Sequence, residues 1–241
     1  MKFGVKTYFD AEFTDYFKDK ADFLEVMAIP GKDYSFLDDY PLPIVVHAMH
    51  NVFGVNFVDE ALVEKNREAV DFAIEVADRC GAEKIIVHPG RLDEDSCSVE
   101  QAVDFLEGLD DRIIIENLTV GNGGVVSSKP EEMRRFIEKM GRKICFDVNH
   151  AIAAAEHYGE DSFEYVKEFL EMGPVHYHLG GQVLGAVKDG HLSFEDSDIP
   201  VEKILGILPE DAWVTLETTT DIEAVEKDLG FVRGVVNDIG D

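Results

Sequence analysis

Nine residues of this chain have side chains that commonly bind metal ions or move protons, and most of them end short apolar segments. Five are histidines and four are carboxylates: His47, His88, His150, His178 and His191, with Glu116, Asp147, Asp189 and Glu217. Imidazole and carboxylate groups suit zinc, manganese and iron. Because one ion uses roughly four to six ligand atoms, the set predicts two or three divalent transition-metal ions, with zinc favoured and manganese or iron as alternatives.

The charge of this set also favours bound cations. Carboxylates that converge on one site repel one another, and their burial without compensating charge is costly. One divalent ion would leave the four carboxylates at about −2, whereas three would leave about +2 and attract a phosphate group. A single histidine or glutamate in such a position is more often a hydrogen-bonded or solvated residue, so the prediction depends on the complete set.

Eight short segments with strand-like composition must position these residues. They are Phe3–Lys6, Phe23–Met27, Ile44–His47, Lys84–His88, Arg112–Glu116, Ile144–Asp147, Val175–His178 and Trp213–Glu217. Several contain continuous apolar runs, which are typical of parallel strands buried on both faces. Helical patterns fall between them, over Asp10–Lys18, Asp59–Cys80, Ser98–Leu106, Ser128–Gly141, Phe163–Met172, Val201–Leu208 and Ile222–Leu229.

This alternation predicts a single α/β domain over residues 1–241 with the (β/α)8 TIM-barrel fold, whose usual length is about 250 residues. A doubly wound open sheet is the alternative, but no glycine-rich phosphate turn follows the first strand. The C-terminal ends of barrel strands share one face, which carries the chemistry. Six consecutive strands, the third to the eighth, would therefore direct a histidine or a carboxylate to one mouth.

The ordered motifs resemble those of the endonuclease IV family within the xylose isomerase-like barrel superfamily. The matching segments are His47-Ala48, Val87-His88-Pro89-Gly90, Glu116-Asn117-Leu118-Thr119-Val120-Gly121-Asn122-Gly123, Asp147-Val148-Asn149-His150-Ala151, His178, Asp189-Gly190-His191 and Leu216-Glu217-Thr218. They span the third to the eighth strand. The wider superfamily of sugar isomerases and epimerases shares only the glutamates, the Asp-x-x-His motif and the later histidine. His47, His88 and the Asp-x-His pair therefore favour endonuclease IV.

The resemblance implies a metal-dependent hydrolase that cleaves a phosphodiester, such as the bond 5′ to an abasic site in DNA or a bond in a smaller phosphoester. Glu116 would bridge two metal ions that activate a hydroxide nucleophile, and a third ion would stabilise the leaving oxygen. The other eight residues of the set would complete the ligand shells. Glu116 and Glu217 are the expected catalytic residues.

Two other functions are consistent with these residues. A sugar or sugar-phosphate isomerase or epimerase would hold one ion with Glu116, Asp147, His178 and Glu217, and its two glutamates would move a proton next to a carbonyl. The acidity of the chain and its altered loops favour this alternative, whereas the three to five extra ligands argue against it. A non-catalytic metal-binding barrel would leave the open, ligand-rich mouth without a role.

Several loops depart from the endonuclease IV pattern. Met49 and His50 replace an aromatic residue after the first histidine, Gly180-Gly181 replaces Asn-Asp, and the acidic segment 193–198 replaces a glycine-rich one. The chain has 50 acidic and 22 basic residues, a formal net charge of −28. Because phosphate contacts dominate nucleic-acid affinity, this charge disfavours DNA without excluding it. The expected substrate is a small molecule that contains phosphate or a sugar.

Composition also indicates the cellular compartment in which the chain is expected. No apolar run is long enough to cross a membrane, and the first residues do not resemble a signal peptide. Three cysteines, none in a Cys-x-x-Cys pair, do not make a disulfide framework, so a reducing cytoplasm is expected. His50 is expected to line the pocket and His176 to lie inside the barrel. The sequence leaves open whether Glu25 binds Lys6 or contacts substrate.

Overall fold

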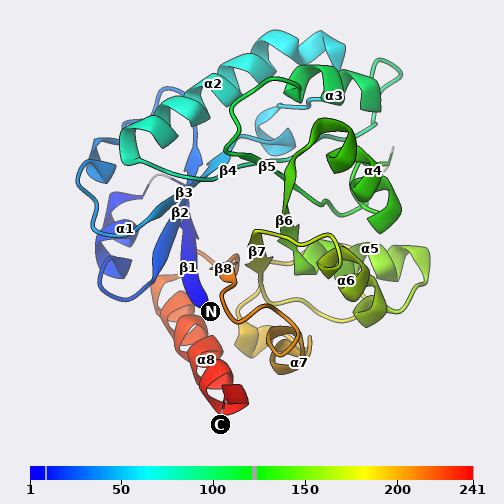
Figure 1. The fold of residues 1–241 in the computed structure, drawn as a ribbon. Helices are drawn as coiled ribbons and strands as arrows, with labels where there is room; N and C mark the ends of the chain where they lie inside the picture. The colour runs from blue at the N-terminus through cyan, green and yellow to red at the C-terminus, as the bar shows by residue number, and fades with distance from the viewer. Residues whose placement is uncertain (9, 121–123, 241) are drawn as a thin grey trace.

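The computed structural model describes residues 1–8, 10–120 and 124–240. In these residues, eight parallel strands close into a barrel, each paired with the next along the chain and the last with the first (Figure 1). They are β1 (Lys2–Thr7), β2 (Phe23–Ala28), β3 (Ile44–Ala48), β4 (Ile85–Val87), β5 (Ile113–Glu116), β6 (Lys143–Asp147), β7 (His176–Leu179) and β8 (Trp213–Leu216). The predicted (β/α)8 barrel is confirmed, and each predicted strand corresponds to an observed one.

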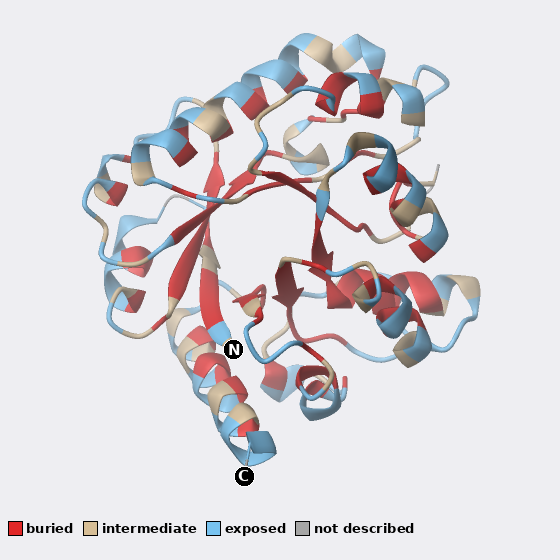
Figure 2. Ribbon diagram, in the orientation of Figure 1, coloured by how far each residue is buried: buried red, intermediate tan, exposed pale blue. Residues whose placement is uncertain are grey.

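Helices surround the strands, with buried inner faces and exposed outer faces (Figure 2). They are α1 (Ala11–Phe17), α2 (Val63–Cys80), α3 (Val99–Leu106), α4 (Pro130–Met140), α5 (Val148–Tyr158), α6 (Ser162–Leu170), α7 (Val201–Leu205) and α8 (Ile222–Gly240). Short 3-10 turns are η1 (Ser35–Leu37), η2 (Asn51–Phe53), η3 (Glu60–Leu62) and η4 (Phe194–Asp196). Within the described ranges, no helix is both long and apolar enough to span a membrane.

The helix boundaries follow from local capping chemistry. The Ser98 hydroxyl accepts a hydrogen bond of 3.1 Å from the backbone N–H of Gln101, which begins α3 as the sequence predicts. Gly81 and Gly141 end α2 and α4 in the left-handed region, with φ of 67° and 62°. Three predicted ends were wrong: α2 begins at Val63 instead of Asp59, α7 stops at Leu205 instead of Leu208, and α8 continues beyond Leu229 to Gly240.

The sequence patterns do not predict α5, and its position explains why. Asp147 is both the last residue of β6 and the N-cap of α5, so no loop separates strand from helix. Residues 148–155 are all buried, which removes the polar face by which a surface helix is recognised. This direct passage from strand to helix places His150 one turn above Asp147.

The barrel interior is layered along its axis. Phe23, Val45, Ile86, Ile114 and Cys145 form an apolar cluster separate from the main core, and Trp213 packs against it. The Phe23 and Trp213 rings lie 4.9 Å apart between centroids. Because strand side chains alternate, the residues two positions further along these strands also point inward. The next layer, nearer the C-terminal strand ends, therefore consists of the polar residues that form the candidate site.

Candidate metal centre

Strand alternation brings the ligand side chains into one layer. Val45, Ile86, Ile114 and Cys145 lie in the apolar cluster, and His47, His88, Glu116 and Asp147 follow them by two residues. His178 and Glu217 come from β7 and the residue after β8. His88 and Glu217 stand one residue beyond their strands, not at the last strand residue as the sequence predicts.

The first group of ligand atoms gathers around one oxygen of Glu116. The Nε2 atoms of His47 and His88 each lie 3.1 Å from Oε2 of this carboxylate. His47 and Glu116 are buried. These three residues offer two nitrogens and one oxygen close enough to bind the same ion.

The second group gathers around Nδ1 of His178. This nitrogen lies 2.8 Å from Oε1 of Glu217, 3.6 Å from Oε2 of Glu116 and 3.8 Å from Oδ2 of Asp147. All four side chains are buried. Glu116 belongs to both the first and the second group, which is the geometry of a bridging carboxylate.

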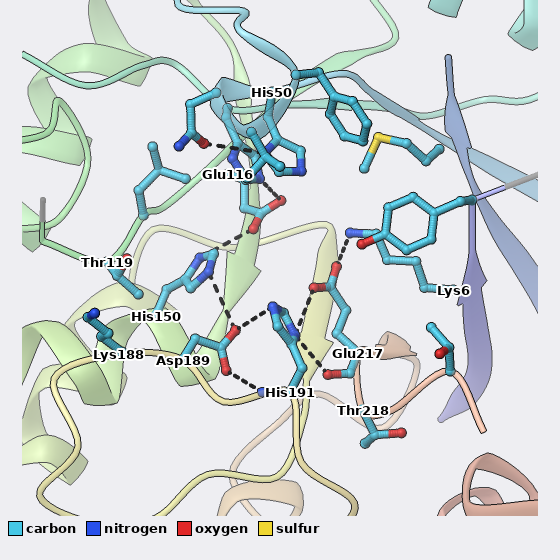
Figure 3. A pocket seen from close by; sticks show the side chains of 18 of the residues that line it. Lys6, His50, Glu116, Thr119, His150, Lys188, Asp189, His191, Glu217 and Thr218 are labelled. Atoms are coloured by element: carbon cyan, nitrogen blue, oxygen red, sulfur yellow. Dashed lines mark hydrogen bonds and ion pairs between the residues drawn. The ribbon is translucent and has the colours of Figure 1, made fainter.

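The third group gathers around Oδ2 of Asp189, nearer the mouth (Figure 3). This oxygen lies 3.2 Å from Nε2 of His191 and 3.7 Å from Nε2 of His150. His191 has φ of 43°, a left-handed conformation that is rare for a residue with a side chain. Such strain persists where surrounding contacts enforce it and is frequent at functional sites.

In four of the five histidines, a hydrogen bond on the far side of the ring leaves one nitrogen to bind a cation. Nδ1 of His88 has no such partner among the described residues. A backbone carbonyl or a carboxylate oxygen can only accept, so the ring nitrogen facing it carries the proton. His47, His150 and His191 each donate from Nδ1 to a backbone carbonyl, those of Ala48, Asn117 and Glu217, at 2.7, 2.8 and 3.0 Å. His178 donates from Nε2 to Glu25 at 3.0 Å. This is the arrangement found around metal-binding histidines.

The spacing of the donor atoms fits transition-metal ions. Two ligand atoms at about 2.0–2.1 Å from a tetrahedral zinc ion lie about 3.4 Å apart. The separations within the three groups run from 2.8 to 3.8 Å around this value. The set thus fits divalent cations in donor chemistry, in ring orientation and in spacing.

The pKa shifts in this cluster indicate that protons on His150 and on Asp147 reduce the net negative charge of the buried carboxylates. Burial raises the pKa of the Asp147 carboxyl to about 7. Burial alone would lower the pKa of His150, but the carboxylates of Asp147 and Glu116 outweigh it and raise the value to about 10. The pKa of Glu116 is well below its usual value despite burial, because His88 and His178 face it. A divalent cation would take the place of these shared protons.

Two asparagines hold the strand ends that carry the ligands. The Asn117 side chain donates to the backbone carbonyl of Asp147 and accepts from its N–H, at 2.8 and 2.7 Å. Asn149 makes the same pair of bonds with Gly180, at 2.9 and 2.8 Å. A β-carbon on Gly180 would lie 2.4 Å from the carbonyl oxygen of Glu217. The Gly180-Gly181 departure therefore lets the loop after β7 approach β8 closely.

A second polar layer lies directly beneath the ligands. Oε2 of the fully buried Glu25 accepts hydrogen bonds from His178 at 3.0 Å, from Thr215 at 2.7 Å and from His176 at 3.3 Å. Its other oxygen lies 3.3 Å from the ammonium group of Lys6, which also pairs with Glu217. The structure thus answers the open question about Glu25: it binds Lys6. The expected interior position of His176 is confirmed.

Above the ligands, a cavity of about 650 Å³ opens to solvent, within the size range of sites for small molecules. Its wall includes His50, as predicted, and the His50 ring stacks on that of His88 with centroids 4.6 Å apart. Burial lowers the pKa of His50 to about 2, so its ring is neutral. Lys6, Arg91 and Lys188 also face the cavity.

All nine residues selected from the sequence meet at this site. The sequence reasoning missed the roles of Asn117, Asn149 and Arg91, and it considered Lys6 only as a partner of Glu25. The signal for the asparagines was present, since each follows a strand-end ligand by one or two residues. In the Glu116–Gly123 motif, Gly121 and Gly123 lie outside the described residues.

Relatives of known name match parts of this chain. It is 31% identical to endonuclease 4 of Thermus thermophilus over 165 residues, which are 62% of this chain and 58% of that protein. It is 27% identical to a probable endonuclease 4 of Thermoplasma acidophilum over 132 residues, or 53% of this chain and 45% of that protein. The chain thus matches about half the length of these curated relatives. The predicted resemblance to endonuclease IV is confirmed.

Solved structures with the same fold carry different activities in their names. A D-tagatose 3-epimerase-like protein superposes with a TM-score of 0.76 at 20% identity, covering 100% of this chain and 98% of the other. A structure of endonuclease IV from Thermus thermophilus gives 0.76 at 21% identity, covering 99% and 100%. The family model for xylose isomerase-like TIM barrels matches residues 35–235. This chain therefore belongs to the xylose isomerase-like TIM barrel family.

Proposed function

We propose that this protein is a metal-dependent hydrolase of phosphodiesters, acting on a small phosphoester or on a short abasic oligonucleotide. Three donor groups support three divalent ions, held by His47, His88 and Glu116, by Glu116, Asp147, His178 and Glu217, and by His150, Asp189 and His191. Such ions lower the pKa of a coordinated water, so that a hydroxide nucleophile forms near neutral pH.

The residues of this chain have separate tasks in the proposed reaction. Glu116 faces both the first and the second group, so its carboxylate sets the distance between them. Glu217 carries the charge that Lys6 and His178 balance. Neutral His50 covers His88 and limits the water that reaches the first group.

The observation that carries the proposal is the set of ligands beyond those that one ion needs. Glu116, Asp147, His178 and Glu217 already complete a four-ligand site around His178. His47, His88, His150, Asp189 and His191 then supply two further groups. The relatives named endonuclease 4 agree with this choice.

A sugar or sugar-phosphate isomerase or epimerase is the second candidate. It is favoured by the four-ligand group around His178 and by the epimerase-like structure that superposes as well as endonuclease IV does. In that function, Glu116 and Glu217 would move a proton next to a carbonyl.

One set of assays separates the two candidates. The protein, supplied with zinc or manganese, is given an abasic oligonucleotide, bis(p-nitrophenyl) phosphate and a panel of ketoses with their phosphates. We expect metal-dependent hydrolysis of a phosphodiester that is abolished by a chelator and restored by metal. Epimerisation of a ketose without hydrolysis would assign the protein to the second candidate.

A further inference from the structure

The cavity above the ligands has an unusual balance of charge for this chain. Acidic residues outnumber basic ones 50 to 22 in the sequence. Around the cavity, the described residues include three bases, Lys6, Arg91 and Lys188, and three carboxylates, Glu116, Asp189 and Glu217. All three carboxylates are in the proposed ligand set. Bases and carboxylates are therefore equal in number around the cavity, unlike in the chain as a whole.

Arg91 is the one base around the cavity with a half-buried side chain and no ion pair among the described residues. Some other arginines of the chain pair with aspartates, as Arg79 does with Asp38 and Arg112 with Asp110. Arg91 has no ion pair and no side-chain hydrogen bond within the described ranges, and its Nε atom is buried without an acceptor. A buried donor without an acceptor is costly in a protein interior, so the Arg91 side chain is available to an anion in the cavity.

The backbone that carries Arg91 is fixed by two asparagines. Asn56 accepts from the Arg91 N–H at 2.8 Å and donates to the Arg91 carbonyl at 2.9 Å. Asn66, fully buried on α2, bonds in the same two-way manner to the backbone of Asn56, at 2.9 and 2.8 Å. Gly90, at φ of 130°, brings this loop against Asn56. The loop is thus held in one conformation before a ligand binds.

The other two bases differ in how their charge is compensated. Lys6 pairs with Glu25 and Glu217 and belongs to the layer beneath the ligands. Lys188 is exposed in the loop after β7, next in sequence to Asp189, and has no ion pair in the part of the chain that the structure describes (Figure 3). Lys188 can therefore give its charge to a ligand in the cavity.

We propose that Arg91 and Lys188 form an anion subsite for a phosphate group of the substrate other than the group that reacts at the metal ions. The proposal deepens the proposed function and rests on its placement of the reacting group at the metal ligands. A guanidinium group binds phosphate oxygens through two parallel N–H donors, and a lysine adds a point charge. The substrate is accordingly a small molecule with a second phosphate.

Two substrate sources supply this chemistry, and binding measurements on the metal-loaded full-length chain separate them. One probe is ribose 1,5-bisphosphate, with ribose 1-phosphate as the counterpart that lacks the second phosphate. The other is the dinucleotide dTpdT with a 5′-phosphate, compared with the same dinucleotide without it. We expect at least one phosphorylated probe to bind at least tenfold tighter than its counterpart, and the stronger preference identifies the source.

The variants Arg91→Met and Lys188→Met test the residues. Arg91→Met should weaken binding of the preferred phosphorylated probe by about tenfold or more, as expected for a lost charged hydrogen bond, with little change for the counterpart. Lys188→Met should weaken it less. Arg135→Met, on the exposed face of α4, is the matched control and should bind like the wild type.

The outcomes decide the proposal without reference to turnover. The proposal is overturned if the Arg91→Met variant binds the phosphorylated probes as tightly as the wild type does. It is also overturned if the wild type shows no preference for probes that carry the second phosphate. If Arg91→Met does not fold by circular dichroism, Lys188→Met, in an exposed loop, decides by the same comparison. If the binding comparison fails, the anion subsite is overturned but the hydrolase proposal is not, because the cleavage assay tests that proposal. If no cleavage is found, the binding comparison still decides the anion subsite.

Discussion

Glu25 and His178 are joined by a hydrogen bond of 3.0 Å from the imidazole Nε2 to a carboxylate oxygen, on the ring edge opposite the nitrogen that faces Glu217. The bond fixes the ring and directs Nδ1 towards the ligand layer. Glu25 is fully buried, and Lys6 balances its charge. A carboxylate behind a histidine raises the basicity of the ring and orients it.

Glu25→Gln should therefore weaken metal binding while leaving the barrel folded. The amide keeps the shape of the side chain but removes the charge that His178 and Lys6 face. We expect the Kd of the most tightly bound zinc or manganese ion to rise about 10- to 100-fold, measured by competition with a chelator of known affinity. Glu226→Gln, which alters a surface ion pair with Lys20, is the control. Equal affinities in both variants would show that Glu25 has no positioning role.

The Glu116→Gln variant should lose both its activity and one bound metal ion. This side chain faces both His88 and His178, and an amide bridges two cations poorly because it lacks charge. We expect kcat to fall by at least about 100-fold with an unchanged circular dichroism spectrum. Turnover like that of the wild type would remove Glu116 from the mechanism.

Undamaged duplex DNA should bind weakly at physiological salt. The net charge of −28 opposes approach to a polyanion, and the segment after β2, residues 29–36, contains only Lys32 as a base. A salt titration of binding to a long duplex measures this, since each phosphate contact steepens the salt dependence. Tight binding with a steep slope would contradict this interpretation of the surface.

Zinc should raise the melting temperature, and more at pH 8 than at pH 6. His150 has a pKa raised to about 10, so a proton occupies it in the metal-free protein and competes with the ion. Raising the pH removes this competitor, so the apparent affinity tightens as the pH rises. An ion at about 100 times its Kd adds about 2.7 kcal/mol of stability. Thermal melts at both pH values, with and without a chelator, measure the difference.

The fold was largely predictable because its signals are local. Runs such as Ile85–Val87 and Ile113–Ile115 are rich in β-branched apolar residues, which is typical of strands buried on both faces. The helix α5 was not predicted, because burial on all sides erased its periodicity. The end of α8 was also missed, since Gly230 and Gly234 interrupt its pattern without breaking the helix.

The ligand residues were predictable because their signal is also local, whereas the contacts around them, such as those of Lys6 and Arg91, were not. A histidine or acidic residue at the end of an apolar strand, as with His47 or Glu116, is visible in the sequence. The pairing of Lys6 with Glu217 depends on barrel closure between β1 and β8, since the two residues are 211 positions apart in the sequence. The lack of an acceptor for Nε of Arg91 likewise follows only from the folded structure, because it depends on all the residues around that side chain.

The number of metal ions per chain tests the central claim most directly. The protein is saturated with zinc, separated from free metal, and measured by elemental analysis against protein concentration. Three ligand groups, the first two of which share Glu116, predict two or three ions per chain, and His47→Ala with His88→Ala should remove one of them. A single ion per chain, with His47 and His88 dispensable for its binding, would contradict the multinuclear centre.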